Sequence, residues 1–225
     1  MRRNYFSFAG ILFAVFALVL TGCGDGAGGG GGSGGDQGTH YLGNTLTLSG
    51  QVYTSPAYGS YTQYTGSDLT VSTNAFASGS ITNGLFSITI GTPPFLFSAT
   101  EAEAYFLDDY DSVSFNPADA EFLGLELKCT LPPSLSYELL KQKRTLSTYE
   151  SVIYIYVDKD VSVTGTGKTR TVDGRIWTTK NLELQLKNGW NAIYTKILNT
   201  SETTRLMDMS LGNPSHLYLV LSEDK

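Results

Sequence analysis

Three acidic residues lie close together near the middle of the chain: Asp108, Asp109 and Asp111. Carboxylate oxygens are the ligands that Ca²⁺ prefers in proteins, which makes this cluster a candidate part of a calcium site. The spacing departs from the EF-hand loop, because counting from Asp109 places Ser114 where that loop requires glycine. We therefore predict a solvated acidic loop and no metal site, with the three residues as candidate calcium ligands in the alternative. The sequence predicts no cofactor.

Motifs for nucleotide binding and catalysis are incomplete. The segment from Gly165 to Thr169 matches the end of a phosphate-binding loop, but Ser162 stands where the full pattern requires glycine. The two histidines, His40 and His216, are far apart, and the sequence offers neither a GxSxG elbow, which requires a strand-to-helix turn, nor an HExxH helix. We therefore expect no nucleotide binding and no enzymatic activity. A hydrolase that uses a pair of carboxylates is the alternative, although no spacing of Asp and Glu singles out a pair.

Trp190 and Tyr194 are the first candidates for ligand binding. The dipeptide Asn188-Gly189 is typical of a two-residue hairpin turn. The register of that hairpin places both rings on its polar face, with Glu183, Gln185 and Lys187. Aromatic rings on a polar sheet face are able to stack on sugars or to anchor a protein, and burial beneath other elements is the alternative.

A second set of aromatic candidates lies in the polar segment 54–67. Tyr58, Tyr61 and Tyr64 follow one another at intervals of three residues among Gly, Ser and Thr. Binding loops that adapt to their ligands often have this composition. We therefore treat these tyrosines as candidate ligand-binding residues, with packing of the rings on the body of the protein as the alternative.

Alternating apolar and polar residues run through most of the chain after residue 44, as expected of half-buried strands. Leu46, Leu48 and Val52 share one face of the first of these strands, and Cys129 points inward from a later one. Residues 152–157 are apolar or aromatic throughout, which predicts a strand covered on both faces.

Turn signals divide these strands into about ten. Asn83-Gly84 and Asp173-Gly174 predict two further tight hairpins. Short helices are expected to begin at Thr100, within a capping-box pattern, and to run from Ser136 to 144. The prediction is an all-β fold: one antiparallel β-sandwich with short helical excursions, over residues 39–225.

The composition supports a folded, acidic protein. Of the 225 residues, 41% are hydrophobic and 16% are charged, so enough apolar side chains are present to form a core. The formal net charge is −6. An acidic surface repels the phosphate backbone, so we expect no nucleic-acid partner.

The N-terminus has the pattern of an export signal. Arg2 and Arg3 precede an apolar run that ends in Leu20-Thr21-Gly22-Cys23, and residues 24–38 are rich in glycine. The four residues at 20–23 resemble the bacterial lipobox. That resemblance implies a signal peptide over 1–22, a lipidated Cys23 that binds the bilayer, and a flexible tether over 23–38. Cys129 then has no cysteine left to pair with in the chain.

Three segments, GSITNGLFSITIGTPP, YIYVDKDVSVTGTGKT and LQLKNGWNAIYTKI, resemble uncharacterised β-rich lipoproteins of host-associated spirochaetes. The resemblance implies a lipid-anchored protein of the bacterial cell envelope, at the outer membrane or cell surface rather than the inner membrane. The predicted function is non-enzymatic: a structural role, or binding of an extracellular protein or glycan. The alternative is a subunit that assembles by pairing its strand edges.

Overall fold

The computed structural model describes residues 40–57, 59–66, 69–103, 106, 109–131 and 135–223. The predicted signal peptide, Cys23 and the tether lie outside the described residues, as do Tyr58 and Asp108. The described part of the chain consists mainly of β-strands, with one short helix, α1 (Ala99–Glu103). No helix in this part is long and apolar enough to cross a membrane.

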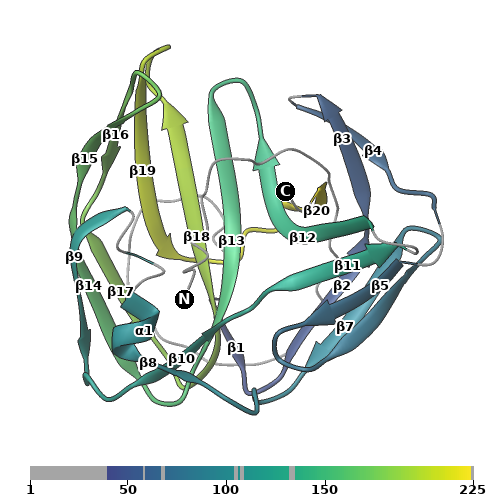
Figure 1. Cartoon of the computed structure of the whole chain (residues 1–225), viewed down its shortest axis with the longest axis horizontal. Helices are drawn as coiled ribbons and strands as arrows, with labels where there is room; N and C mark the ends of the chain where they lie inside the picture. The colour runs from purple at the N-terminus through teal and green to yellow at the C-terminus, as the bar shows by residue number, and fades with distance from the viewer. Residues whose placement is uncertain are drawn as a thin grey trace.

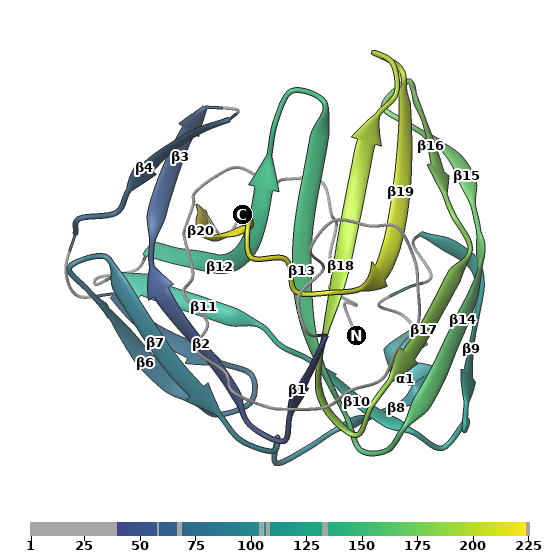
Figure 2. The ribbon, with the colours of Figure 1, turned by 180° about the vertical axis from the view of Figure 1, so that it is seen from behind.

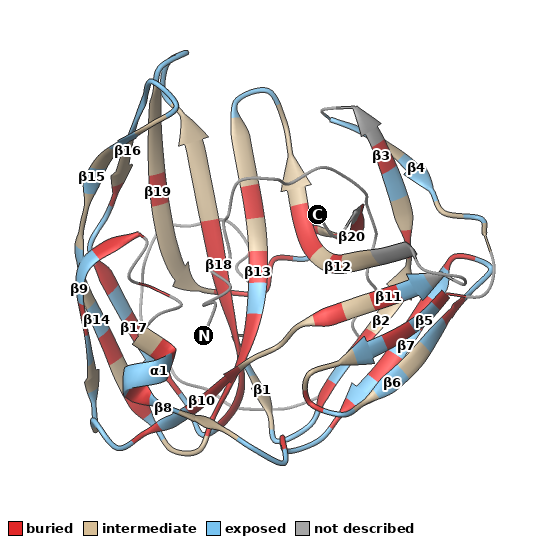
Figure 3. Cartoon of the chain, in the orientation of Figure 1, coloured by how far each residue is buried: buried red, intermediate tan, exposed pale blue. Residues whose placement is uncertain are grey.

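Two long antiparallel strands, β13 (Thr148–Val157) and β18 (Gly189–Asn199), form the centre of the molecule (Figure 1). Side chains of a strand alternate between its two faces. In β13, Val152, Tyr154 and Tyr156 therefore face one hydrophobic core, whereas Ile155 and Val157 face a second. The β13–β18 pair is thus a wall shared by two cores, and the prediction of a strand covered on both faces is confirmed for residues 154–157 (Figure 3).

Strands from both halves of the chain surround the first core, on the right in Figure 1. In order of pairing they are β2 (Leu46–Gln51), β7 (Leu85–Ile90), β6 (Ser78–Thr82), β5 (Leu69–Thr73), β11 (Leu127–Leu131), β12 (Leu135–Arg144) and β20 (Tyr218–Glu223). The short strand β3 (Tyr53–Ala57) pairs with β20 and with β4 (Ser60–Gln63), and β1 (Tyr41–Gly43) pairs with β18. Leu46, Leu48, Val52 and Cys129 are buried in this core, as predicted.

A separate three-stranded sheet covers the second core, on the left in Figure 1. Its strands are β9 (Tyr110–Asn116), β14 (Val161–Gly167) and β17 (Leu182–Leu186). The helix α1 and the short strands β8 (Phe97–Ser98) and β10 (Glu121–Gly124) close one end of this core. Beyond β18, the large sheet continues through β19 (Thr204–Leu211), β16 (Arg175–Thr179) and β15 (Thr169–Val172), as Figure 2 shows from behind. The predicted all-β, sandwich-like fold is confirmed.

Two of the three predicted hairpins are present in the predicted register. Asn83 and Gly84 have φ angles of 51° and 74°, and Ile81 lies opposite Phe86. Asp173 and Gly174 have φ angles of 51° and 72° in the turn between β15 and β16. A Cβ atom on Gly84 would lie 1.8 Å from the carbonyl oxygen of Tyr64, so this turn also requires glycine for lack of space.

The predicted helix from Ser136 to 144 is wrong, because these residues form the strand β12. Its two edges pair with β11 and β13 on one side and with β20 on the other. Hydrogen bonds to three strands outweigh a local helical pattern. The other predicted helix exists as α1, but its capping box begins at Ser98 rather than Thr100, since the Glu101 carboxylate accepts hydrogen bonds from the backbone N–H and hydroxyl of Ser98.

The predicted Asn188-Gly189 hairpin is also wrong. The strand β17 pairs with β14, and β18 pairs with β13, so the chain crosses here from one sheet to the other. Asn188 is held by the loop that follows β13: its backbone N–H donates to Asp160 Oδ1 at 2.9 Å, and its side-chain amide donates to the carbonyl of Asp158 at 2.5 Å. Gly189 has a φ of 113° and packs against the carbonyl of Gly43.

Candidate functional site

The prediction that Trp190 and Tyr194 form an exposed binding face is wrong. Trp190 is fully buried, its indole N–H donates a 3.0 Å hydrogen bond to the carbonyl of Gly91, and its ring packs edge-on against Tyr156. Tyr194 is buried and donates its hydroxyl hydrogen to Glu150. The crossing at Gly189 is the physical reason, because it turns these rings towards the first core rather than towards the polar side of β17.

The described tyrosines of segment 54–67 pack on the body of the protein. The Tyr61 hydroxyl lies 2.6 Å from the carbonyl oxygen and 2.5 Å from the backbone nitrogen of Arg144, and its ring contacts Tyr218. Burial raises the pKa of the Tyr61 hydroxyl. Tyr64 is half-buried against the first core. These contacts match the alternative of packed rings, and Tyr58 lies outside the described residues.

The candidate calcium ligands do not converge on a metal site in the described part of the chain. Asp109 is buried and forms an ion pair with Arg170, with 2.7 Å between Oδ1 and Nη2, while Asp111 is exposed. No group of three or more His, Cys, Asp or Glu residues among those described is arranged to hold a metal ion. Asp108 lies outside the described residues.

Two further candidates, the segment from Gly165 to Thr169 and the thiol of Cys129, lack the surroundings that their chemistry requires. The segment from Gly165 to Thr169 joins the strands β14 and β15, so no helix follows to present its amides to a phosphate. Cys129 is fully buried, and burial raises the pKa of its thiol to about 12. A thiol with such a pKa stays protonated and unreactive at neutral pH.

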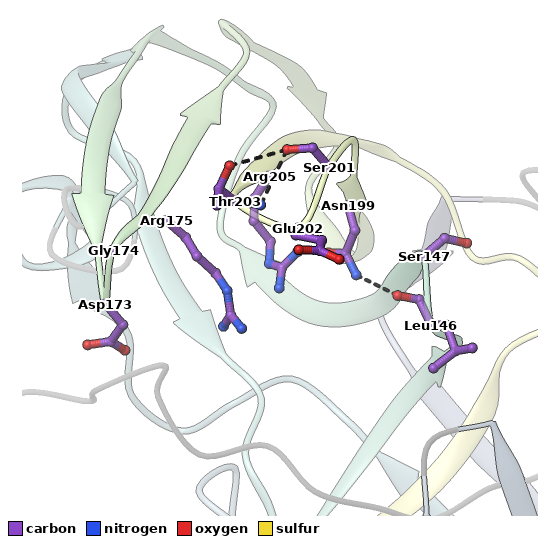
Figure 4. A pocket seen from close by; sticks show the side chains of 10 residues that line it. All are labelled: Leu146, Ser147, Asp173, Gly174, Arg175, Asn199, Ser201, Glu202, Thr203 and Arg205. Carbon is purple, nitrogen blue, oxygen red and sulfur yellow. Dashed lines mark hydrogen bonds between the residues drawn. The ribbon is translucent and has the colours of Figure 1, made fainter.

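The turns of three hairpins meet at one end of the molecule, along the upper edge of Figure 1. They connect β12 to β13, β15 to β16, and β18 to β19. Between them lies an open cleft of about 710 Å³, which we call the tip cleft (Figure 4). Its lining residues are Leu146, Ser147, Asp173, Gly174, Arg175, Asn199, Ser201, Glu202, Thr203 and Arg205.

Hydrogen bonds from Asn199 join two of these turns. Its side-chain amide donates to the carbonyl of Leu146 at 2.7 Å, and its backbone N–H donates to the carbonyl of Ser147 at 2.8 Å. The third turn is attached through the backbone N–H of Ile176, which donates to the carbonyl of Thr203 at 2.7 Å. The three turns therefore form a connected wall rather than three independent loops.

Two arginines bring positive charge into the tip cleft. Arg205 donates to the side-chain oxygen of Asn199, and its guanidinium lies 5.9 Å from the centre of the Trp177 ring. Arg175 extends into the space between the β15–β16 hairpin and the β12–β13 turn (Figure 4). No hydrogen bond or ion pair joins its guanidinium to another described residue.

The chain matches no family model, no curated protein and no solved structure. The tip cleft is therefore assigned from its own geometry. None of its residues was a candidate in the sequence, because only the β15–β16 turn carried a recognisable signal. Turns far apart in the sequence come together through the parallel pairing of β16 with β19, which no local pattern predicts.

A second polar cluster lies at the rim of the first core and was also missed. Lys141 is only 3% exposed, and its amine donates to Asn213 Oδ1, which also accepts the Tyr154 hydroxyl at 3.3 Å. Burial lowers the pKa of Lys141 to about 8. Amines with lowered pKa values serve as bases and nucleophiles in enzymes, but so deep a position denies a substrate access. Alternation with Leu139 was the signal that could have placed Lys141 on the inner face of a strand.

The neighbouring Glu150 is buried, and its carboxylate is surrounded by a hydrogen-bond donor and basic side chains. It accepts a hydrogen bond from Tyr194, and it lies 3.5 Å from Nε2 of His216 and 3.8 Å from Nζ of Lys196. Burial, and after it the hydrogen bond to Glu150, raises the pKa of Tyr194. Glu150 lies on β13, Tyr194 and Lys196 lie on β18, and His216 lies in the 212–217 segment. The carboxylate therefore has a structural role, because it links these three parts of the chain.

Proposed function

We propose that the protein is a lipid-anchored module of the bacterial cell envelope that binds a protein or glycan through the tip cleft and catalyses no reaction. The observation that carries this proposal is the meeting of three hairpin turns around one polar cleft. Turns on a rigid β-scaffold are a common place for binding sites, because the scaffold fixes them while their sequences stay free to vary.

The tip cleft is prepared for binding before a ligand arrives. Asn199 links the β12–β13 and β18–β19 turns, and the Thr145 hydroxyl accepts hydrogen bonds from the backbone N–H groups of Ser147 and Thr148 at 3.3 and 3.0 Å. Turns that are already ordered lose little conformational entropy on binding, which favours affinity.

The lining of the tip cleft supports binding over catalysis. The described residues that line it include no histidine or cysteine, so the usual base and thiol nucleophile are missing. A glycosidase requires two carboxylates that face each other across the substrate. In Figure 4 the carboxylate of Asp173 points away from Glu202, which disfavours the hydrolase alternative.

The anchor is tested by replacing the predicted lipidated cysteine. Cys23→Ala removes the thiol that the lipobox resemblance assigns to the acyl chain, so we expect loss of labelled palmitate and accumulation of a larger, uncleaved precursor. Two or three acyl chains hold a protein stably at a bilayer, whereas none does. Palmitate labelling in the native bacterium and gel mobility check the result, with Cys129→Ala as the control. Unchanged labelling of Cys23→Ala would remove the anchor from the proposal.

Binding at the tip cleft is tested by blocking it. Ser201→Trp places a large ring at an exposed position of the lining, and we expect it to lower binding at least tenfold for any ligand retained on an array of glycans and matrix proteins. Thr70→Trp, at an exposed position of β5 that lies outside the lining, is the matched control. Equal binding by both variants would place the ligand elsewhere on the protein.

A further inference from the structure

We infer that the tip cleft recognises a saccharide that bears a carboxylate, such as a uronic or sialic acid, with Arg175 and Arg205 as the residues that bind the carboxylate. This inference rests on the proposed function and names the ligand class for the same site. Three features support it: the partners and orientation of the two arginine side chains, the polar lining around them, and the negative charge of the rest of the protein.

The two guanidinium groups differ in how they are held. Arg205 is oriented by its hydrogen bond to Asn199 and by the Trp177 ring. Arg175 has no hydrogen-bond or ion-pair partner among the described residues, and Figure 4 shows both side chains extending in the same direction into the cleft. A planar guanidinium donates two parallel hydrogen bonds to a carboxylate. A guanidinium in a cleft without a protein partner, such as that of Arg175, therefore favours a ligand that bears a carboxylate.

The acidic residues of the cleft do not neutralise Arg175. In the view of Figure 4, the Glu202 side chain lies on the side of Arg205, and the Asp173 carboxylate points away from the cleft. The chain as a whole carries a formal net charge of −6, so the body of the protein tends to repel an anion. A specific site for an anion therefore has to rely on local cations, and the tip cleft supplies two.

The other lining side chains favour a saccharide over a peptide. Ser147, Ser201 and Thr203 offer hydroxyl groups that both donate and accept hydrogen bonds, as sugar hydroxyls require. Protein-binding sites are usually centred on buried apolar or aromatic anchors. The only large apolar side chain in the described lining is Leu146, and it is 86% exposed rather than set in a pocket.

The test measures binding of two acidic saccharides and their neutral counterparts to the full lipidated chain in detergent, by isothermal titration calorimetry. The probes are 3′-sialyllactose against lactose, and hyaluronan tetrasaccharide against the same tetrasaccharide with its carboxyl groups reduced to alcohols. We expect at least one acidic probe to bind roughly tenfold or more tightly than its neutral counterpart, because charge-assisted hydrogen bonds contribute most to such contacts. The two pairs distinguish a sialic acid from a uronic acid.

Variants assign this difference to the arginines. Arg175→Gln is expected to weaken binding of the acidic probe roughly ten- to a hundredfold and to leave the neutral probe unchanged. Lys168→Gln removes one positive charge at the start of the same β15–β16 ribbon, outside the described lining, and is expected to leave binding within about twofold. Because Arg175 is exposed, its variant should melt at the temperature of the wild type.

Four outcomes would overturn the inference. Equal binding of acidic and neutral saccharides, or binding of proteins alone on the array, would show that the tip cleft does not recognise a saccharide carboxylate. Either result would leave the proposed binding function intact. Undiminished binding of the acidic probe by Arg175→Gln would show that the cleft arginine does not recognise it. Retention of no saccharide and no protein would overturn the inference and the proposed function together.

Discussion

Trp190→Ala is expected to lower the free energy of unfolding by about 3–5 kcal/mol, the range measured when a buried aromatic side chain is truncated in a core. Trp190 belongs to β18, one of the two central strands, and is fully buried in the first core, with its ring centre 5.4 Å from that of Tyr156. Its removal leaves a cavity and also deprives the carbonyl of Gly91 of the indole N–H. A buried acceptor left unpaired adds to the cost.

Urea denaturation of the full chain at pH 7, followed by circular dichroism, measures this loss. Trp177→Ala is the matched control, since Trp177 is half-buried on β16 and packs beside the Arg205 guanidinium near the surface. We expect the control to cost less than half as much. A Trp190→Ala protein that loses no more stability than Trp177→Ala would contradict the buried position of this ring.

The Asn-Gly or Asp-Gly pattern predicted two hairpin turns correctly and a third wrongly, and tertiary contacts explain the difference. Asn83 and Asp173 adopt φ angles of 51° within turns whose flanking strands pair with each other, so local residues suffice to specify them. Asn188 is instead bound to the backbone and side chains of the Asp158–Asp160 loop, about thirty residues earlier in the chain. Those hydrogen bonds hold Asn188 away from a hairpin between β17 and β18. A prediction from neighbouring residues does not include contacts with such a distant loop.

The error at Asn188 decided the functional prediction as well. A hairpin at that point would have left the Trp190 ring on a polar face, whereas the observed crossing buries it. The all-β fold class, the alternation and two hairpin registers could be read from the sequence because they depend on patterns within a few residues. The tip cleft could not, because it depends on which hairpins lie side by side, and that is fixed by the pairing of β16 with β19 and of β13 with β18.

Lys141→Met is expected to stabilise the protein at neutral pH. Burial lowers the pKa of Lys141 from 10.5 to about 8, because the residue is 3% exposed and, among the described residues, its amine donates to the neutral oxygen of Asn213. The shift corresponds to roughly 3 kcal/mol of penalty for carrying the charge in the folded state. Methionine keeps the length of the side chain and removes the charge, and replacing buried charges by apolar side chains of similar volume is often stabilising.

The pH dependence of this gain identifies its cause. Below about pH 8 the lysine is protonated in both the folded and the unfolded chain, so the folded wild type bears the full penalty and the variant gains most, at pH 6–7. Between pH 8 and 10.5 the unfolded chain binds more protons at this residue than the folded chain does, so the wild type gains stability as pH rises and the advantage of the variant shrinks. Burial also raises the pKa of the neighbouring Tyr154, but this contribution is common to both proteins and cancels in the difference.

Urea denaturation of wild type, Lys141→Met and the half-exposed control Lys128→Met at pH 7 and pH 10 measures the effect. A gain that is the same at both pH values would mean that folding does not lower the pKa of Lys141 and that the variant acts through packing alone.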